Sequence, residues 1–321
     1  MNAIRLQDDD GTEELAYEDV PRPTPRTGEV LVRVRAAGVN PLDWLICDGT
    51  ITALRDEPCP WTPGWDVSGV GEAVGGGATG VEPGDAVYGM ARLPGGGGTF
   101  AEYATMSVEA VVPKPASLSH VEAAAVPMAG QTAVHALYEA GGLTPGQRVL
   151  VHAAAGGVGH TAVRFAANTG AHVVGTASGY NEEYLRGLGV DEGIDYREER
   201  FEDVLDEVDL VLDAVGGDVL ERSVQVVRPG GVVVTLPERP SEAVVEGFRD
   251  DHDVDVRFFD VVLDSDPVTL QVVSSAVEGG VVEPTVSDTY PLSRAREALD
   301  RSADGHVRGK LVLEVTEDAD E

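Results

Sequence analysis

Hydrophobic and polar residues alternate along the first third of the chain, as they do in half-buried β-strands. The segment EVLVRVRAAGVN, residues 29–40, repeats apolar positions with a period of two, which is typical of an antiparallel strand. Three more short runs, DVSGVGEAV, GDAVYGM and FAEYATM, follow before Lys114 and are separated by clusters of Gly and Pro. This pattern predicts a compact, mostly β domain built like a barrel.

The pattern changes at His120, where long helical stretches begin to alternate with short, fully apolar runs. RVLVHAA, HVVGTAS, VDLVLDAV and GGVVVTL have the composition of buried parallel strands joined by crossover helices. The pattern is mixed again near Asp288, and the strand-like GKLVLEV lies close to the end of the chain. We therefore expect an α/β protein with a β domain of residues 1–119 and 286–321 and a parallel-sheet domain of residues 120–285.

The chain carries a large excess of acidic residues, which describes its surface. The chain has 321 residues, enough for two domains, and its 56 acidic against 23 basic residues give a net charge of −33. Such a surface repels phosphate backbones, which argues against a nucleic-acid partner. The acidic residues are spread along the chain and only two basic residues are Lys, so we interpret the excess as the surface of a halophilic protein. An ordinary acidic cytosolic protein is the alternative.

Cysteine and histidine usage excludes the common metal clusters. Cys47 and Cys59 are the only cysteines, which leaves no disulfide framework and no paired C-x-x-C motif, and no two His residues are three or four positions apart. We therefore expect no metal and a reducing, cytoplasmic location. The segment MNAIRLQDDDGTEE has no apolar core of a signal peptide, and no run of about 18 apolar residues occurs, so no membrane association is expected.

The strongest local motif is VLVHAAAGGVGHTAVRFAANTGAHVVGTAS, a strand, a glycine turn, a helix and a second strand. Small residues allow a tight turn and let the backbone approach a pyrophosphate at the positive end of the helix. The motif predicts a dinucleotide site, although any α/β protein can use such a turn structurally. The residues expected to contact the pyrophosphate are Ala155, Gly156, Gly157, Val158 and Gly159.

The end of the second strand bears on the choice of cofactor. A site that prefers NAD usually has a carboxylate about 20 residues after the glycines, where it binds the ribose 2′-hydroxyl. Residues 176–181 read TASGYN and contain none, while Glu182 and Glu183 have the positions of first-turn helix acids. NADPH is therefore favoured. The nearest cations, Arg186 and Arg197, are not placed by the sequence.

Five motifs in order resemble the medium-chain dehydrogenase/reductase superfamily, in its zinc-independent quinone oxidoreductase and enoyl-reductase branch. They are AAGVNPLDW, PGWDVSGVG, AGQTAVHAL, AAAGGVG and RGKLVLEV, and they span nearly the whole chain. The resemblance implies a GroES-like, mostly β barrel domain and a Rossmann domain with a doubly wound parallel sheet. It also implies a small-molecule substrate, and we expect a homodimer.

The resemblance also bears on zinc. Zinc-bearing members of the family carry a Cys where this chain has Asn40 and a His-Glu pair where it has Trp65-Asp66. Without a Lewis acid, a simple ketone has nothing to stabilise its developing alkoxide, whereas a quinone or an α,β-unsaturated carbonyl spreads the charge over a conjugated system. The expected reaction is hydride transfer from NADPH to a conjugated acceptor, and a zinc alcohol dehydrogenase is excluded.

By resemblance, two groups of residues surround the cofactor and substrate. Asn40 and Asp43 are implied to lie where the nicotinamide meets the substrate, although turn and cap chemistry around Pro41 is an alternative role for both. Trp44 is implied to line the substrate pocket. The residues implied to bind the rest of the cofactor are Thr132, Ser178, Asn181, Tyr196 and Gly216.

Two readings of the function stay open at this point. The first is an NADPH-dependent reductase, favoured by Asn40 and Asp43; the second is a non-catalytic NADPH-binding protein with a structural or sensory role. Leu45 and Cys47, where many relatives have basic residues, mildly favour the second. The glycine-rich segment at residues 93–103 is read as a loop, with a lid over the substrate as the alternative.

The net charge makes a prediction about stability. Because 33 uncompensated negative charges on one chain repel one another until salt screens them, the melting temperature should rise from low salt toward molar KCl. Thermal melts across a salt series measure this. A melting temperature that stays flat or falls over the series would remove the interpretation as a halophilic protein.

Overall fold

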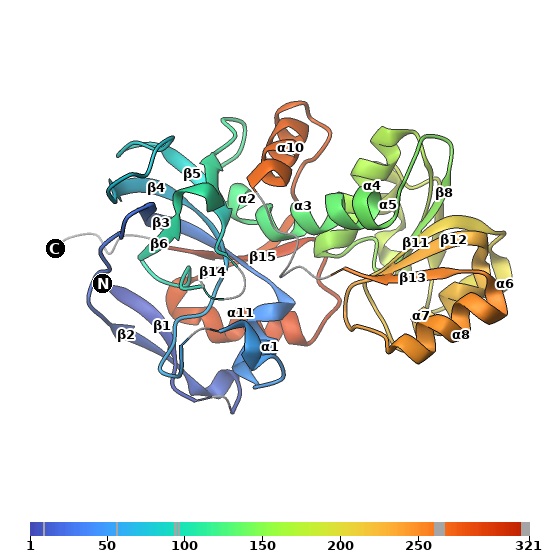
Figure 1. The fold of residues 1–321 in the computed structure, drawn as a ribbon, viewed down its shortest axis with the longest axis horizontal. Helices are drawn as coiled ribbons and strands as arrows, with labels where there is room; N and C mark the ends of the chain where they lie inside the picture. Colours follow the sequence, from blue (N-terminus) through green and yellow to red (C-terminus); the bar gives the residue numbers. More distant parts are fainter. Residues whose placement is uncertain (9, 56, 93–94, 96, 260–266, 316–321) are drawn as a thin grey trace. The chain divides into compact units, whose positions relative to one another are not determined.

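The computed structural model describes residues 1–321 except 9, 56, 93–94, 96, 260–266 and 316–321, and it divides into two compact units (Figure 1). Unit 1 comprises the described residues of 1–129, 262–280 and 284–321, and unit 2 those of 130–261 and 281–283. The expected α/β class, with one mostly β unit and one parallel sheet, is confirmed. Among the described residues, no helix is long and apolar enough to cross a membrane.

Unit 1 is organised around one long strand, β3 (Glu29–Val39), which pairs with β6 (Tyr103–Ser107), β4 (Asp66–Val74) and β15 (Lys310–Glu314). The alternation read from the sequence buries Val30, Val32 and Val34. The pairing of β15 with β3 confirms that the C-terminal strand returns to the first domain. The other strands of this unit are β1 (Asn2–Leu6), β2 (Leu15–Asp19), β5 (Ala86–Met90), β7 (Val111–Pro113) and β14 (Val286–Pro291).

The helices of unit 1 lie against these strands. Gly38 allows α2 to approach closely, since a Cβ at this position would stand 2.3 Å from the Ala124 carbonyl oxygen. Tyr88 in β5 hydrogen-bonds Ser274 at 2.5 Å. These contacts explain why residues 120–129 and 267–280 belong to unit 1, a division that differs from the expected boundaries at 119 and 286. The helices are α1 (Pro41–Cys47), α2 (His120–Ala124), α10 (Pro267–Glu278) and α11 (Ala295–Ala303).

The helical stretch expected from His120 onward is not one helix. It consists of α2, then α3 (Pro127–Val134), then a π-helix over His135–Ala140. Proline at 127 explains the break, because proline lacks the N–H that would continue α2 and is well suited to the first turn of a new helix. The boundary between the two units falls within α3, after Ala129.

Unit 2 is a six-stranded parallel sheet in the order β10–β9–β8–β11–β12–β13, with α4 and α5 on one face and α7 and α8 on the other (Figure 1). This is the doubly wound arrangement expected from the apolar runs. The strand order reverses between β8 and β11, and ligands of such sheets bind beyond the carboxyl ends of the strands at that point. The elements are β8 (Arg148–Val151), β9 (His172–Ala177), β10 (Glu192–Asp195), β11 (Val208–Asp213), β12 (Val227–Thr235), β13 (Asp255–Phe258), α4 (Gly157–Thr169), α5 (Glu182–Leu188), α6 (Phe201–Val204), α7 (Asp218–Ser223) and α8 (Glu242–His252).

Candidate functional site

The glycine turn follows β8 at the reversal point of the unit 2 sheet. Ala153 adopts the left-handed conformation, with φ of 51°, and a Cβ on Gly159 would stand 2.1 Å from the Ala153 carbonyl oxygen. Gly156 caps the N-terminus of α4, whose first N–H groups have no partner within the helix. The turn therefore has the close backbone approach and the positive helix end that suit a pyrophosphate.

A neutral histidine, His152, directly precedes the turn and connects it to neighbouring elements. His152 Nδ1 hydrogen-bonds Thr176 Oγ1 and Nε2 hydrogen-bonds Ser223 Oγ, both at 2.9 Å. Burial lowers the pKa of His152 to about 3, so the ring stays neutral and supplies one donor and one acceptor. This histidine, which follows β8, hydrogen-bonds a residue of β9 and a residue of α7.

The end of β9 brings together residues that the resemblance assigned to the adenosine end. Ser178 Oγ donates to the Tyr196 hydroxyl at 3.1 Å, and the Arg197 guanidinium carbon lies 5.8 Å from the centre of the Tyr196 ring. Asn181 is buried at the start of α5. Arg186 instead pairs with Glu182 at 2.7 Å, which leaves Arg197 as the cation beside Ser178 and Tyr196.

A carboxylate does approach this region, from a strand that the sequence argument did not consider. Asp195 ends β10, and a Cβ on Gly179 would stand 2.3 Å from its Oδ2 atom. Residues 176–181 contain no carboxylate, as expected. However, the neighbouring strand β10 brings the Asp195 carboxylate close to them, so the expectation that no carboxylate stands at the end of the second strand is wrong for the folded site. Asp195 Oδ1 accepts the backbone N–H of Arg197 at 3.0 Å, and the Asp195 charge also acts on the Arg197 guanidinium.

The other side of the reversal point is formed after β11. Asp213 Oδ1 accepts the N–H groups of Val215 at 2.9 Å and Gly216 at 3.0 Å, and Gly216 has φ of 76°. Burial raises the pKa of Asp213. The carboxylate thus shapes the turn that holds Gly216. Thr132, the remaining cofactor candidate of this unit, is buried in α3.

In unit 1, Asn40 and Asp43 meet at the start of α1. The Asn40 N–H donates to Asp43 Oδ2 at 2.7 Å, and Pro41 occupies the first helical position. This is half of a capping box, so the cap role considered for Asp43 is present. Both side chains are buried, with Asn40 only 3% exposed, so little of Asn40 is open to a ligand.

The sequence analysis missed a third member of this cluster, Lys310. Its ammonium is buried and donates to the Val39 carbonyl oxygen at 2.8 Å and to Asn40 Oδ1. It also lies 3.7 Å from Asp66 Oδ2, to which Asn40 Nδ2 donates at 2.9 Å. The amide of Asn40 is therefore held between a cation and a carboxyl group.

Electrostatics assign different protonation states to the two carboxyl groups. Burial raises the pKa of Asp43 to about 8, and its Oδ1 has no hydrogen-bond partner within the described residues, which fits a protonated carboxyl. Burial also raises the pKa of Asp66 and lowers that of Lys310. However, Asp66 accepts from Asn40 and from Met128 N–H at 2.8 Å and faces the ammonium, and these contacts favour its ionised form. We infer an ionised Lys310–Asp66 pair and a neutral Asp43.

Trp44, the expected pocket residue, follows Asp43 on α1. Its side chain is partly exposed, and its Nε1 atom is buried and has no hydrogen-bond partner within the described part of the chain. The indole is thus available to present a mainly apolar face. The glycine-rich segment considered as a lid falls partly outside the described residues, at 93, 94 and 96.

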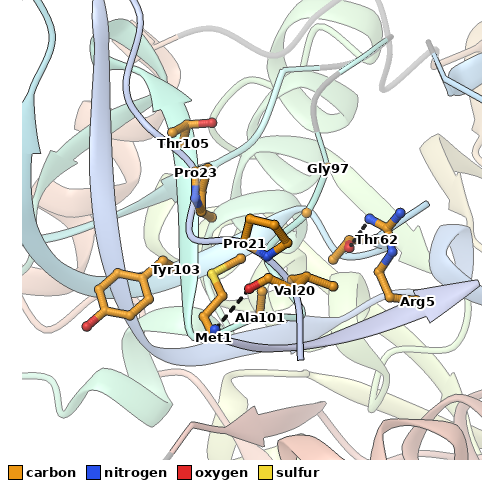
Figure 2. A pocket seen from close by; sticks show the side chains of 12 residues that line it. Met1, Arg5, Val20, Pro21, Pro23, Thr62, Gly97, Ala101, Tyr103 and Thr105 are labelled. Carbon is orange, nitrogen blue, oxygen red and sulfur yellow. Dashed lines mark hydrogen bonds between the residues drawn. The ribbon is translucent and has the colours of Figure 1, made fainter. Parts of the chain in front are cut away.

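A separate pocket of about 350 Å³ lies elsewhere in unit 1 (Figure 2). Arg5 lies on one side and donates to Thr62 Oγ1 at 3.2 Å, while the Met1 amine donates to the Val20 carbonyl oxygen at 2.9 Å (Figure 2). Four of its lining residues, Gly97, Gly98, Ala101 and Tyr103, belong to the 93–103 segment considered as a lid, and none of the residues assigned to the cofactor or the reaction lines it. The pocket is therefore not the place to which we assign the reaction.

Comparison with protein-family models identifies both halves of the chain. Residues 26–116 match the alcohol dehydrogenase GroES-like domain, and residues 188–313 match a model described as zinc-binding dehydrogenase. The chain belongs to the medium-chain dehydrogenase/reductase superfamily. Within the described residues, no group of three or more His, Cys, Asp or Glu side chains could hold a metal ion.

The individual relatives include quinone oxidoreductases and an alkenal/one oxidoreductase. The chain is 31% identical over 313 residues to a chloroplast envelope quinone oxidoreductase homolog of Arabidopsis thaliana, with 95% of each chain covered. It is 32% identical to an NADPH-dependent alkenal/one oxidoreductase of the same plant, covering 98% of this chain and 79% of the relative. The structure of the quinone oxidoreductase from Coxiella burnetii matches with a TM-score of 0.91 at 33% identity. The match covers 98% of this chain and 99% of the Coxiella chain.

The neutral state of Asp43 makes a prediction about pH. With a pKa of about 8 in the fold and near 3.9 when unfolded, Asp43 contributes stability in full below about pH 4, and the contribution is lost as pH rises toward 8. An Asp43→Asn variant cannot ionise, so its melting temperature relative to wild type should increase from pH 4 to pH 8. Melts at constant salt measure it, with exposed Asp48→Asn as control. Parallel curves for Asp43→Asn and wild type would contradict the protonated state.

Proposed function

We propose that this protein is an NADPH-dependent oxidoreductase that reduces quinones or α,β-unsaturated carbonyl compounds without zinc. The observation that carries the proposal is the Asn40 amide, held between Lys310 and Asp66 in a chain of this superfamily. An amide donor can stabilise an oxygen whose charge is delocalised, but it cannot replace a Lewis acid for an isolated ketone. The names of the quinone and alkenal relatives support the same substrate class.

The glycine turn and the end of β9 support NADPH as the cofactor. Gly156 to Gly159 would hold the pyrophosphate at the N-terminus of α4. Arg197, whose guanidinium lies near the Tyr196 ring that Ser178 hydrogen-bonds, is the cation we propose for a 2′-phosphate. Gly216 and Thr132 would bind the cofactor closer to the nicotinamide, and Asn181 would contribute at the adenosine end.

The donor set argues against a catalytic zinc ion. Zinc in proteins is bound by thiolate, imidazole and carboxylate groups. Positions 40 and 65, where zinc-bearing members have Cys and His, carry an amide and an indole instead. Position 66 keeps a carboxyl group, Asp66, but its Oδ2 atom lies 3.7 Å from the Lys310 ammonium. A divalent cation at this place would have poor ligands and a buried positive charge as its neighbour, so we propose a zinc-independent reaction.

The residues of unit 1 then have distinct roles. Bound NADPH supplies the hydride. The second Nδ2 hydrogen of Asn40, which has no partner among the described residues, donates to the carbonyl oxygen of the acceptor as negative charge develops on it. Asp43 keeps the start of α1 in place and holds a proton on Oδ1 at neutral pH, and Trp44 forms an apolar wall.

The assembly and location of the protein stay predictions. We expect a homodimer, and we expect a cytoplasmic location from the cysteine usage. The halophilic interpretation depends on the charge composition in the same way. None of the three is needed for the chemistry proposed here, which depends on the side chains around Asn40 and on the glycine turn.

The cofactor proposal predicts that NADPH binds more tightly than NADH and that Arg197 causes part of the difference. Since a hydrogen bond to a charged group contributes ~1.5–3 kcal/mol, Arg197→Ala should weaken NADPH binding about tenfold and leave NADH binding nearly unchanged. Fluorescence titration in high salt measures both dissociation constants. Arg186→Ala is the matched control, because Arg186 pairs with Glu182. Tighter binding of NADH than of NADPH by wild type would contradict the proposal and would indicate that Asp195 binds the ribose 2′-hydroxyl of NADH.

The reaction proposal predicts that wild type oxidises NADPH with quinones and enals but leaves saturated ketones almost untouched. Asn40→Ala should lower kcat for a conjugated acceptor about tenfold or more, the order of one lost transition-state hydrogen bond, with NADPH affinity nearly intact. Stopped-flow and steady-state assays in high salt measure these values.

Two results would contradict the reaction proposal. Unchanged turnover in Asn40→Ala would remove Asn40 from catalysis. Wild type that binds NADPH but reduces no member of a panel of quinones, enals and ketones would favour the non-catalytic binding protein instead.

A further inference from the structure

The Asn40 amide has two ends of nearly equal size, and its surroundings decide which end faces which way. Oxygen and nitrogen exchange places when the side chain turns by 180°, so sterics alone do not select an orientation. In this structure Oδ1 accepts from the Lys310 ammonium and Nδ2 donates to Asp66 Oδ2 at 2.9 Å. The orientation is therefore set by the charges on either side of the amide.

The two neighbours are one-sided in their hydrogen bonding. An ammonium group only donates, and an ionised carboxylate only accepts. In the opposite orientation, the NH2 group of Asn40 would face Lys310 and its oxygen would face Asp66, so both charge-assisted bonds would be lost and two repulsive contacts would replace them. Lys310 is itself fixed by the Val39 carbonyl oxygen at 2.8 Å, and Asp66 by the Met128 N–H at 2.8 Å.

The orientation determines what Asn40 offers to a ligand. With Oδ1 and one Nδ2 hydrogen engaged, the remaining group is an N–H donor. A donor stabilises the oxygen of a carbonyl that is receiving a hydride, whereas the amide oxygen in the same place would repel it. Lys310 thus determines which chemical group Asn40 has left to offer, an N–H donor and not an amide oxygen.

We propose that Lys310 is a positioning residue that holds the Asn40 amide in the orientation in which its remaining N–H donates to the acceptor carbonyl. This inference rests on the proposed reductase function and deepens it. Lys310 comes from β15 and Asn40 follows β3, and the antiparallel pair Leu311 and Val39 brings the two side chains together. The ammonium acts through the amide and does not touch the substrate.

The test compares Lys310→Met with the double variant Lys310→Met/Asp66→Asn. The single variant leaves Asp66 as an unpaired buried carboxylate and is expected to be unstable, whereas the double variant removes both charges. The double variant should recover a melting temperature close to that of wild type but keep kcat at least about tenfold lower, with the dissociation constant of NADPH within about twofold of wild type. Lys114→Met, which removes the only other lysine, is the control and should have wild-type kcat.

Repeating the substitutions in the Asn40→Ala variant distinguishes an effect of Lys310 on Asn40 from a general structural effect. If Lys310 acts through Asn40, adding Lys310→Met/Asp66→Asn to Asn40→Ala should lower kcat by less than about twofold further. Side-chain ¹⁵N–¹H spectra give a readout independent of turnover. The Asn40 amide hydrogens should be shifted and slow to exchange in wild type and Lys114→Met, and should lose both properties in the double variant.

The outcomes distinguish the inference from the function on which it rests. Wild-type kcat in a folded double variant, or full additivity with Asn40→Ala, overturns the positioning role and leaves the reductase proposal intact. A wild type that binds NADPH but turns over no acceptor overturns the reductase proposal and the reaction role of Lys310 with it. In that case the amide spectra still decide whether Lys310 orients Asn40.

Discussion

A lysine ammonium inside a protein has to be neutralised and hydrogen-bonded where it lies, because removing a charge from water costs several kcal/mol unless good partners replace the water. In unit 1 three adjacent strands meet this requirement. β15 carries Lys310, β3 ends at the Val39 carbonyl and continues into Asn40, and β4 begins with Asp66. A shift of β15 by one residue would turn Lys310 to the other face of the sheet, so the register of these strands and the candidate site depend on one another.

Unit 2 positions its site by a different constraint, the shape of the backbone. The left-handed Ala153 and the close approach of Gly159 fix the turn before α4, and the polar groups beneath it are neutral, as the low pKa of His152 shows. A pyrophosphate brings its own charge, so a site of uncharged N–H groups and a helix end suits it. In the reaction proposed above, the acceptor oxygen acquires charge only as the hydride arrives, and the oriented Asn40 amide of unit 1 would meet that demand.

The parts that the sequence predicted are those determined by local pattern. Alternation identified β3 and continuous apolar runs identified β8, β9, β11 and β12, because each buries its own residues. Adjacent residues also revealed the contact of Asn40 with Asp43, since a cap spans three positions. Asp195 beside Gly179 could not be found in this way, because it depends on how a neighbouring strand pairs. Lys310 is 270 positions from Asn40, and nothing in the local pattern of RGKLVLEV marks it as buried.

Composition did contain a signal for Lys310, although not one of pattern. Only two of the 23 basic residues are lysines, so arginine supplies almost all the surface cations. A guanidinium is broad and planar, whereas an ammonium is compact and can fit among oxygen atoms in a small space. Both lysines occupy such places: Lys114 donates to the carbonyl oxygens of Pro115 and Leu118, and Lys310 to those of Val39 and the Asn40 side chain. In a chain that uses arginine elsewhere, both lysines are thus found where an ammonium donates to two carbonyl oxygens.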